Sequence, residues 1–126
     1  MDFDGYVQDF NRNDERPMVE RWFTEDVVVE VSGRVIRGQA DWIAAVEASH
    51  AGGVRETLQP VAVLQDGDLI LAEMNIEYVA AEGHPGFRLG PLEPGVPATY
   101  KYFAVYRLRD QRIAGLKLAF WPEPVS

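Results

Sequence analysis

The second half of the chain contains four long stretches in which apolar and polar side chains alternate, and these stretches limit the possible folds more than any other feature. Successive side chains of a strand point to opposite faces, so alternation over about ten residues predicts a long strand with one buried face. Tight turns at Asp66-Gly67 and Asp110-Gln111 join the stretches in pairs, as in antiparallel hairpins. The predicted strands cover residues 54–65, 68–80, 99–109 and 112–121.

The first half of the chain carries the helical patterns. Apolar side chains recur at positions i, i+3, i+4 and i+7 over residues 3–10, which predicts a helix with one buried face. Further helices are predicted over 14–24 and 39–51, with short strands at 26–31 and 34–37 between them. The order ααββαββββ predicts an α+β fold in which a curved, mixed or antiparallel sheet wraps around three N-terminal helices as a cone.

Residues 82–98 interrupt the predicted sheet. This stretch holds four glycines and four prolines, too many for the interior of a helix or a strand, so it is predicted to be a long loop. A loop of this length in a compact domain is usually a functional lid, an interface arm or a disordered segment. We therefore expect residues 1–126 to form one domain with one excursion, and the loop either closes a pocket or reaches another subunit.

Composition narrows the classes of function. The 20 acidic and 12 basic residues give a net charge of −8, which disfavours binding to nucleic acid. The chain has no cysteine, and its two histidines, His50 and His84, have no carboxylates at metal-ligand spacing, so no metal site is predicted. A glycine-rich phosphate loop after a strand is also missing, and we expect no cofactor.

The N-terminal sequence and the length of the apolar runs indicate where in the cell the protein is expected. Residues 1–5 are acidic, whereas a signal peptide begins with a basic and then an apolar segment. No apolar run approaches the length that spans a bilayer. We therefore expect a cytoplasmic protein that does not associate with membranes.

Several local motifs resemble the nuclear transport factor 2-like (SnoaL-like) superfamily. They are the run from Tyr6 to Asn11, the segment Trp22-Phe23-Thr24-Glu25-Asp26 with the three valines after it, and Gly38 at the start of a helix. The resemblance covers nearly the whole chain and implies a cone-shaped fold with an internal pocket. The superfamily includes ketosteroid isomerases, limonene-epoxide hydrolases, polyketide cyclases, dehydratases and non-catalytic binding domains, so the fold alone does not assign a reaction.

The resemblance also indicates where catalytic groups could stand. In ketosteroid isomerases a tyrosine, an aspartate base and a protonated aspartate act together. Tyr6 matches the tyrosine, the base corresponds to Glu30 or Val31, and the second acid corresponds to Phe103 or Ala104. The last predicted strand lacks the aspartate of the cyclases. The positions that match the epoxide hydrolase triad are Met74, Ile76 and Leu118, which transfer no proton.

Three residues are the candidates for catalysis: Tyr6, Glu30 and His50. Glu30 is the only carboxylate near the pocket end of the first predicted strand, and apolar surroundings make a carboxyl a better general base. Alternation allows a second interpretation, in which Glu30 faces away from Val29 and Val31 and lies on a polar surface. Tyr6 could be a core aromatic residue, and His50 could be a solvated histidine at a helix end.

Tyrosines gather on the strand faces that are predicted to point inward. Each buried phenol needs a hydrogen-bonding partner, so four of them exceed what packing requires and indicate a pocket. Tryptophans of the second and third helices could wall the same cavity. The residues expected to bind substrate are Trp22, Trp42, Met74, Tyr78, Tyr100, Tyr102, Tyr106 and Leu118.

These features favour a protein with a pocket for a small apolar or aromatic molecule. The first hypothesis is an isomerase, cyclase, dehydratase or hydrolase that uses acid–base chemistry on a cyclic or polycyclic substrate. The alternative is a non-catalytic ligand-binding or dimerisation domain. The outer strand face carries charges of both signs together with apolar residues, which favours a homodimer through the sheet. The apolar residues of that face are Phe103, Val105, Ile113 and Trp121.

Overall fold

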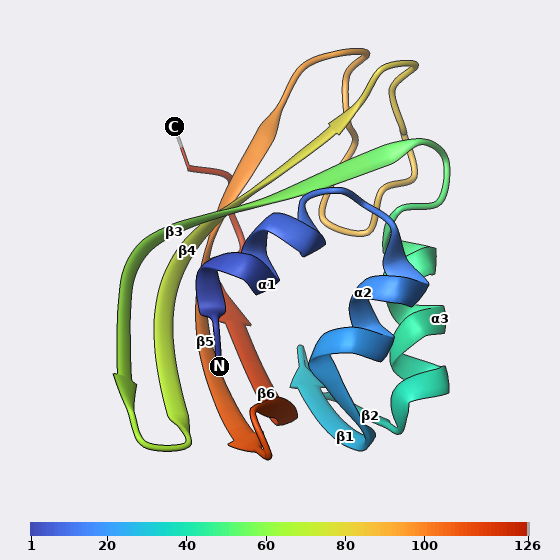
Figure 1. Cartoon of the computed structure of the whole chain (residues 1–126). Coiled ribbons are helices and arrows are strands. Elements are labelled where there is room, and N and C mark those ends of the chain that lie inside the picture. The colour runs from blue at the N-terminus through green and yellow to red at the C-terminus, as the bar shows by residue number, and fades with distance from the viewer. Residues whose placement is uncertain (126) are drawn as a thin grey trace.

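The computed structural model describes residues 1–125 and contains three helices and six strands (Figure 1). The order of elements is the one predicted from the sequence, and the α+β cone is confirmed. The elements are α1 (Phe3–Phe10), α2 (Glu15–Trp22), β1 (Phe23–Val31), β2 (Arg34–Arg37), α3 (Gln39–Ser49), β3 (Val54–Asp66), β4 (Leu69–Ala80), β5 (Ala98–Arg109) and β6 (Arg112–Phe120).

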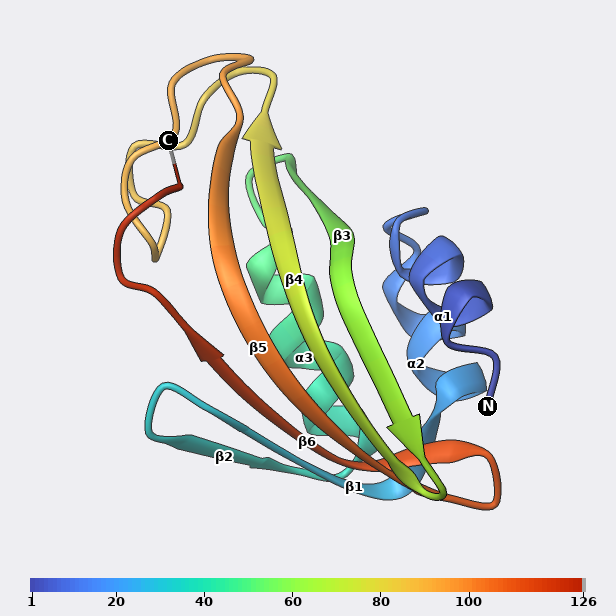
Figure 2. The ribbon, with the colours of Figure 1, turned by 90° about the vertical axis from the view of Figure 1, so that its left-hand side faces the viewer.

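The six strands form one curved, mixed sheet in the order β2-β1-β6-β5-β4-β3. All neighbours are antiparallel except β1 and β6, which run parallel. Figure 2 shows the long strands bending away from the β1–β2 hairpin, with the three helices on the concave side. The concave face of the sheet and the helices therefore enclose the interior of the cone.

Local sequence explains where the helices begin. The Asp2 carboxylate accepts a hydrogen bond from the Gly5 backbone at 2.9 Å and caps α1. Pro17 lies in the first turn of α2, where its missing N–H is tolerated. Gly38 precedes α3 with a φ of 89°, which favours glycine, and its N–H donates to the Val27 carbonyl at 2.7 Å. That bond ties the start of α3 to β1.

The inward face of β4 and β5 is the one that alternation predicts. Tyr78 is fully buried, and Tyr102 and Tyr106 are 3% and 1% exposed. On β6 the alternation breaks, because the register between β5 and β6 shifts next to Leu108 and leaves an extra residue in β6. Ile113 is consequently buried, whereas alternation predicts that it lies on the outer face.

The loop over residues 82–98 folds back onto its own chain. His84 and Leu92 exchange backbone hydrogen bonds of 2.9 and 3.0 Å, and Leu92 is buried. Phe87 is also buried, with its ring centroid 5.0 Å from that of Tyr78. The loop thus packs against β4 through Phe87. Its own contacts within the chain hold it in position without a second subunit.

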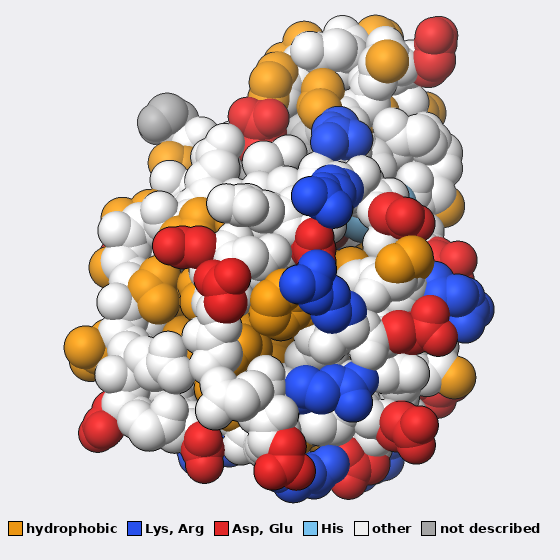
Figure 3. Space-filling view, viewed as in Figure 1, with side chains coloured by type: hydrophobic (Ala, Val, Ile, Leu, Met, Phe, Trp, Pro, Cys, Tyr) orange, Lys and Arg blue, Asp and Glu red, His pale blue; other side chains and the backbone are white. Residues whose placement is uncertain are grey.

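Charged side chains of both signs lie among uncharged and apolar ones on the face in Figure 3. On the face in Figure 3 a column of Lys and Arg side chains runs between α1 and α2, with Asp and Glu side chains beside it. Arg12 and Arg21 both pair with Asp9, at 3.3 and 3.0 Å. Within residues 1–125, no helix has the length and apolarity required to cross a membrane.

The outer sheet face carries exposed apolar side chains beside ion pairs. Phe103 is 43% exposed and Leu71 is 42% exposed. On the same face Lys101 pairs with Glu73 at 2.7 Å. Because the face holds both signs of charge, a second copy related by a two-fold axis can complement it. The homodimer stays a prediction.

We predict that the wild-type protein has twice the mass of one chain in light scattering after gel filtration. Phe103→Glu is expected to yield the monomer, because it places a charge in the apolar part of the outer face. Val96→Glu is the matched control, since Val96 is also apolar and is 54% exposed but lies in the loop. A wild-type monomer, or a Phe103→Glu dimer, would contradict association through the sheet.

Candidate functional site

The interior of the cone contains a cavity of about 380 Å³ between the concave sheet face, α1, α3 and the loop. One wall is a single face of α3, because Trp42, Ala45, Val46 and Ser49 follow the i, i+3, i+4, i+7 spacing and all line the cavity. The sheet contributes apolar and phenolic side chains to the opposite wall. The predicted site residues that line the cavity are Tyr6, Trp42, Met74, Tyr78, Tyr102, Tyr106 and Leu118.

Two of the residues predicted to bind substrate do not line the cavity and make hydrogen bonds within the chain. Trp22 is absent from the cavity wall, and its indole N–H donates to the Asp9 carboxylate at 2.8 Å. The Tyr100 hydroxyl donates to the Leu89 carbonyl at 2.7 Å and so holds the loop. Both aromatic residues stabilise the walls of the cavity without forming its surface.

Glu30 lies outside the cavity. Its side chain is 47% exposed, and the carboxylate lies 3.6 Å from the Lys117 ammonium group. Val29, next to it in β1, is fully buried, so alternation turns Glu30 to the outer face. Glu30 therefore lies on the polar outer face of its strand, which is the second of the two interpretations of the sequence. It does not line the cavity.

The carboxylate that does line the cavity is Glu56, which the sequence reasoning missed. It is 7% exposed and lies on β3 between the buried residues Val54 and Leu58. One oxygen of the carboxylate is 2.8 Å from Nε2 of His50, and the other accepts from the Tyr78 hydroxyl at 3.2 Å. The sequence did contain one indication of this role. Glu56 alternates with Val54 and Leu58, so it occupies an inward position between two apolar residues.

His50 lies directly after α3 and joins two carboxylates. Its Nδ1 is 2.8 Å from Glu15 of α2, and its Nε2 is 2.8 Å from Glu56. Both partners are acceptors, so a ring that donates from both nitrogens, the imidazolium, satisfies this arrangement. The ring itself does not line the cavity. His50 therefore acts on the cavity through Glu56.

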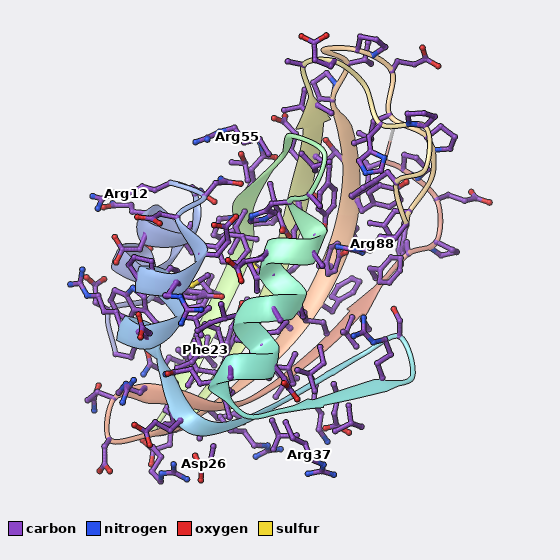
Figure 4. All side chains as sticks on the ribbon, turned by 90° about the vertical axis from the view of Figure 1, so that its right-hand side faces the viewer. Arg12, Phe23, Asp26, Arg37, Arg55 and Arg88 are labelled. Carbon is purple, nitrogen blue, oxygen red and sulfur yellow. The ribbon has the colours of Figure 1, made fainter. Side chains whose placement is uncertain are left out.

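The contacts continue from Glu56 through two phenols to the loop. Tyr78 donates its only hydroxyl proton to Glu56, so Tyr102, at 3.0 Å, must be the donor to the Tyr78 oxygen. Burial raises the pKa of both phenols, and they remain neutral donors near pH 7. Arg88 reaches the same place from the loop, with Nη2 3.4 Å from the Tyr78 hydroxyl and 2.9 Å from Ser49 (Figure 4).

A larger hollow of about 550 Å³ lies on the outer sheet face and is mainly apolar. Its charged lining residues are Glu73 and Lys117, each of which pairs with another surface residue. The convergence of a buried carboxylate, two phenols and a guanidinium makes the inner cavity the candidate site. Among residues 1–125 no group of three or more acidic or histidine side chains is arranged to hold a metal ion.

Comparison with protein families agrees with the shape of the fold. The sequence matches the model of the SnoaL-like domain over residues 3–116. The chain belongs to the SnoaL-like family. The resemblance to the nuclear transport factor 2-like superfamily that the motifs indicated is thereby confirmed. No protein with curated annotation matches the sequence.

Several solved structures share the fold of this chain. A proposed polyketide cyclase from Xanthomonas campestris is 22% identical with a TM-score of 0.74, over 90% of this chain and 82% of that chain. A proposed polyketide cyclase from Pseudomonas putida is 23% identical with a TM-score of 0.74, over 93% and 86%. A proposed hydroxylase from Streptomyces galilaeus is 16% identical with a TM-score of 0.71, over 94% and 85%. At this level of identity the likeness shows a shared fold.

The contacts of His50 make a pH-dependent contribution to stability. Burial of the ring opposes its charge, but the hydrogen bonds that the ring donates to Glu56 and Glu15, together with their negative charges, outweigh burial, so the pKa of His50 is raised above 6.5. Because the pKa is higher in the folded than in the unfolded chain, protonation stabilises the fold below about pH 6.5. That contribution is lost as the pH rises through the folded pKa.

We predict that the His50 imidazole titrates with a midpoint above pH 6.5 in NMR spectra. Glu15→Gln is expected to lower the midpoint, because it removes one of the two carboxylate charges that face the ring. His84→Gln assigns the signal, since the chain has only two histidines. A wild-type midpoint at or below 6.5, or no change in Glu15→Gln, would contradict the described contacts.

Proposed function

We propose that this SnoaL-like protein binds a small, apolar cyclic ketone in the inner cavity and moves a proton at the carbon next to its carbonyl group. Such a proton transfer is shared by isomerases, cyclases and dehydratases. The observation that carries the proposal is Glu56, a buried carboxylate at the cavity wall that His50 and Tyr78 hold in place. The likeness to proposed polyketide cyclases supports a small-molecule ligand.

Glu56 is the general base in this proposal. Each carboxylate oxygen can accept more than one hydrogen bond, so the contacts to His50 and Tyr78 leave lone pairs for a substrate proton. The carbon–hydrogen bond breaks, its proton goes to Glu56, and its electron pair moves into the carbonyl group to form an enolate. Return of the proton from Glu56 to another carbon of a conjugated enolate completes an isomerisation. In a cyclisation, the enolate carbon forms a bond to a second carbonyl carbon, and the resulting alkoxide oxygen takes the proton back from Glu56.

The groups beside Glu56 suit the charge that develops. Arg88 uses Nη2 for its contacts with Tyr78 and Ser49, so its other N–H groups are available to an enolate oxygen. His50 is a positioning residue, because it holds Glu56 by hydrogen bond without lining the cavity. Glu15 fixes the other edge of the imidazole ring and balances its charge.

A second candidate function is binding without turnover. Both oxygens of Glu56 already have partners within the chain, and the phenols of Tyr78 and Tyr102 bond to each other. A ligand held by the apolar area of the cavity would then leave this network unchanged. The two candidates differ in one measurable property, which is proton exchange on the bound ligand.

The test uses 1-tetralone, a cyclic ketone with one exchangeable CH₂ group next to its carbonyl. In D₂O we expect the wild-type protein to accelerate loss of the signal of that group in proton NMR. Glu56→Gln is expected to slow the catalysed exchange by roughly 100-fold or more, the usual contribution of a general base. Glu30→Gln is the matched control and is expected to keep the wild-type rate, because Glu30 lies on the outer face.

Two outcomes would contradict the proposal. Equal rates in Glu56→Gln and wild type would remove Glu56 as the base. Saturable binding of 1-tetralone, seen as an increase in melting temperature, without any accelerated exchange would favour the non-catalytic candidate.

A further inference from the structure

The strand β3 lies at the edge of the sheet, and only the first half of its free edge is covered. Its one neighbour in the sheet is β4. The Asn11 side chain donates to the Leu58 carbonyl at 3.0 Å and accepts from the Leu58 N–H at 2.8 Å. Asn13 makes the same two bonds with Glu56, both at 2.9 Å. Each side-chain amide thus takes the place of a residue in a neighbouring strand.

The second half of the free edge has no such cover. Because Leu58 bonds outward, Pro60 also faces the free edge, and it has no N–H to leave unpaired. The register with β4 then shifts by one residue between Pro60 and Ala62. An extra residue reverses the alternation, so Val63 and Gln65 direct their N–H and C=O groups to the free edge. No backbone hydrogen bond from another part of residues 1–125 reaches those groups.

The uncovered part of β3, residues 61–65, is apolar and exposed, and we call it the open edge. Val61, Val63 and Leu64 are 56%, 45% and 67% exposed. No charged residue lies between Glu56 and Asp66 in the sequence. Hydrophobic side chains are visible on the left of Figure 3, where β3 runs. Edge strands of natural proteins usually carry charges or a cover that prevents pairing, so an edge without them is suited to the addition of another strand.

The two ends of the open edge carry opposite charges. At the hairpin to β4, Asp66 and Asp68 are exposed and take part in no ion pair found within residues 1–125. At the other end, Arg55 donates to the Asn11 carbonyl at 2.8 Å, and the side chain of Arg12 is 73% exposed (Figure 4). A strand of the same sequence that runs in the opposite direction brings its acidic end to this basic end.

We propose that two copies of this chain pair through their open edges as antiparallel strands, with Val63 opposite Val63 on a two-fold axis. Such a contact is self-complementary, as two-fold symmetry requires. In this register Leu64 lies opposite Ala62, so apolar side chains face one another. Asp68 of each copy lies opposite Leu58 of the other, beside the two arginines. The contact is separate from the cavity, and the inference goes beyond the proposed function.

The contact is small and therefore weak. It involves about five residues of each chain, whereas a stable interface has about 20 to 30 a side. We therefore expect pairing at protein concentrations on the order of 1 mM and little of it in the dilute samples of gel filtration. The predicted homodimer through the outer sheet face is a different contact, because it buries side chains of the sheet surface and leaves the backbone groups of the edge free.

Cysteine cross-linking tests the register, because the chain has no cysteine of its own. Residues opposite each other in paired strands have Cα atoms about 5.5 Å apart, which a disulfide can bridge. Val63→Cys at about 1 mM is expected to become mostly cross-linked under mild oxidation. Leu64→Cys is the matched control, because its two copies are offset by two residues and lie about 8 Å apart, beyond the reach of a disulfide. A mixture of Leu64→Cys and Ala62→Cys is expected to cross-link, since these positions are opposite each other.

Sedimentation equilibrium tests the association itself, without any cysteine. The mean mass of the wild-type protein is expected to rise between about 10 μM and 1 mM. Val63→Lys is expected to remove the rise, because it places two like charges opposite each other at the axis. Val96→Lys changes the net charge equally but lies in the loop, and it is expected to keep the rise.

Two results would overturn the proposal. One is a wild-type mean mass that does not change with concentration. The other is equal cross-linking of Val63→Cys and Leu64→Cys, because random collision or contact through the outer face links any exposed cysteine. Neither measurement uses a ligand or changes Glu56, so the outcome does not depend on the proposed function.

Discussion

The bridge from Glu15 through His50 to Glu56 connects the elements that enclose the cavity. Glu15 belongs to α2, His50 follows α3, and Glu56 lies on β3. From Glu56 the contacts reach β4 through Tyr78 and β5 through Tyr102. Removing one partner of a buried charge is costly, so loss of either carboxylate would leave one ring nitrogen of His50 without its acceptor. The site and the packing of the helices on the sheet therefore depend on the same contacts.

Only one end of this bridge faces the cavity, and it lies on β3. The histidine is held on both ring nitrogens, which leaves Glu56 as the member of the bridge that faces the cavity. The loop completes the site from the other side, because Phe87 packs on Tyr78 and Arg88 reaches its hydroxyl. A segment rich in glycine and proline thus contributes a cation to the cavity wall, beside the phenols and the carboxylate of the sheet.

Periodicity alone predicted the order of elements, the cone and the inward face of β4 and β5, because these follow from local spacing. It misplaced Ile113, since a single extra residue in β6 reverses the faces on one side of the irregularity and leaves no mark in the sequence. It also missed Glu56, whose partners Glu15 and His50 come from distant parts of the chain. Pairing of charged groups across elements is a property of the tertiary structure, so alternation can separate the outer position of Glu30 from the inner position of Glu56 but cannot reveal the partners of Glu56.

The central claim is that ligands occupy the inner cavity rather than the outer sheet face. The most direct measurement is a two-dimensional ¹H–¹⁵N spectrum of the three tryptophan indoles during titration with 1-tetralone. We predict that the Trp42 signal shifts in a saturable manner, because Trp42 lines the cavity, while the signal of Trp22, whose N–H is bonded to Asp9, changes little. A shift confined to Trp121, which is exposed beside Lys101, with no change at Trp42, would show that the ligand binds the outer sheet face instead.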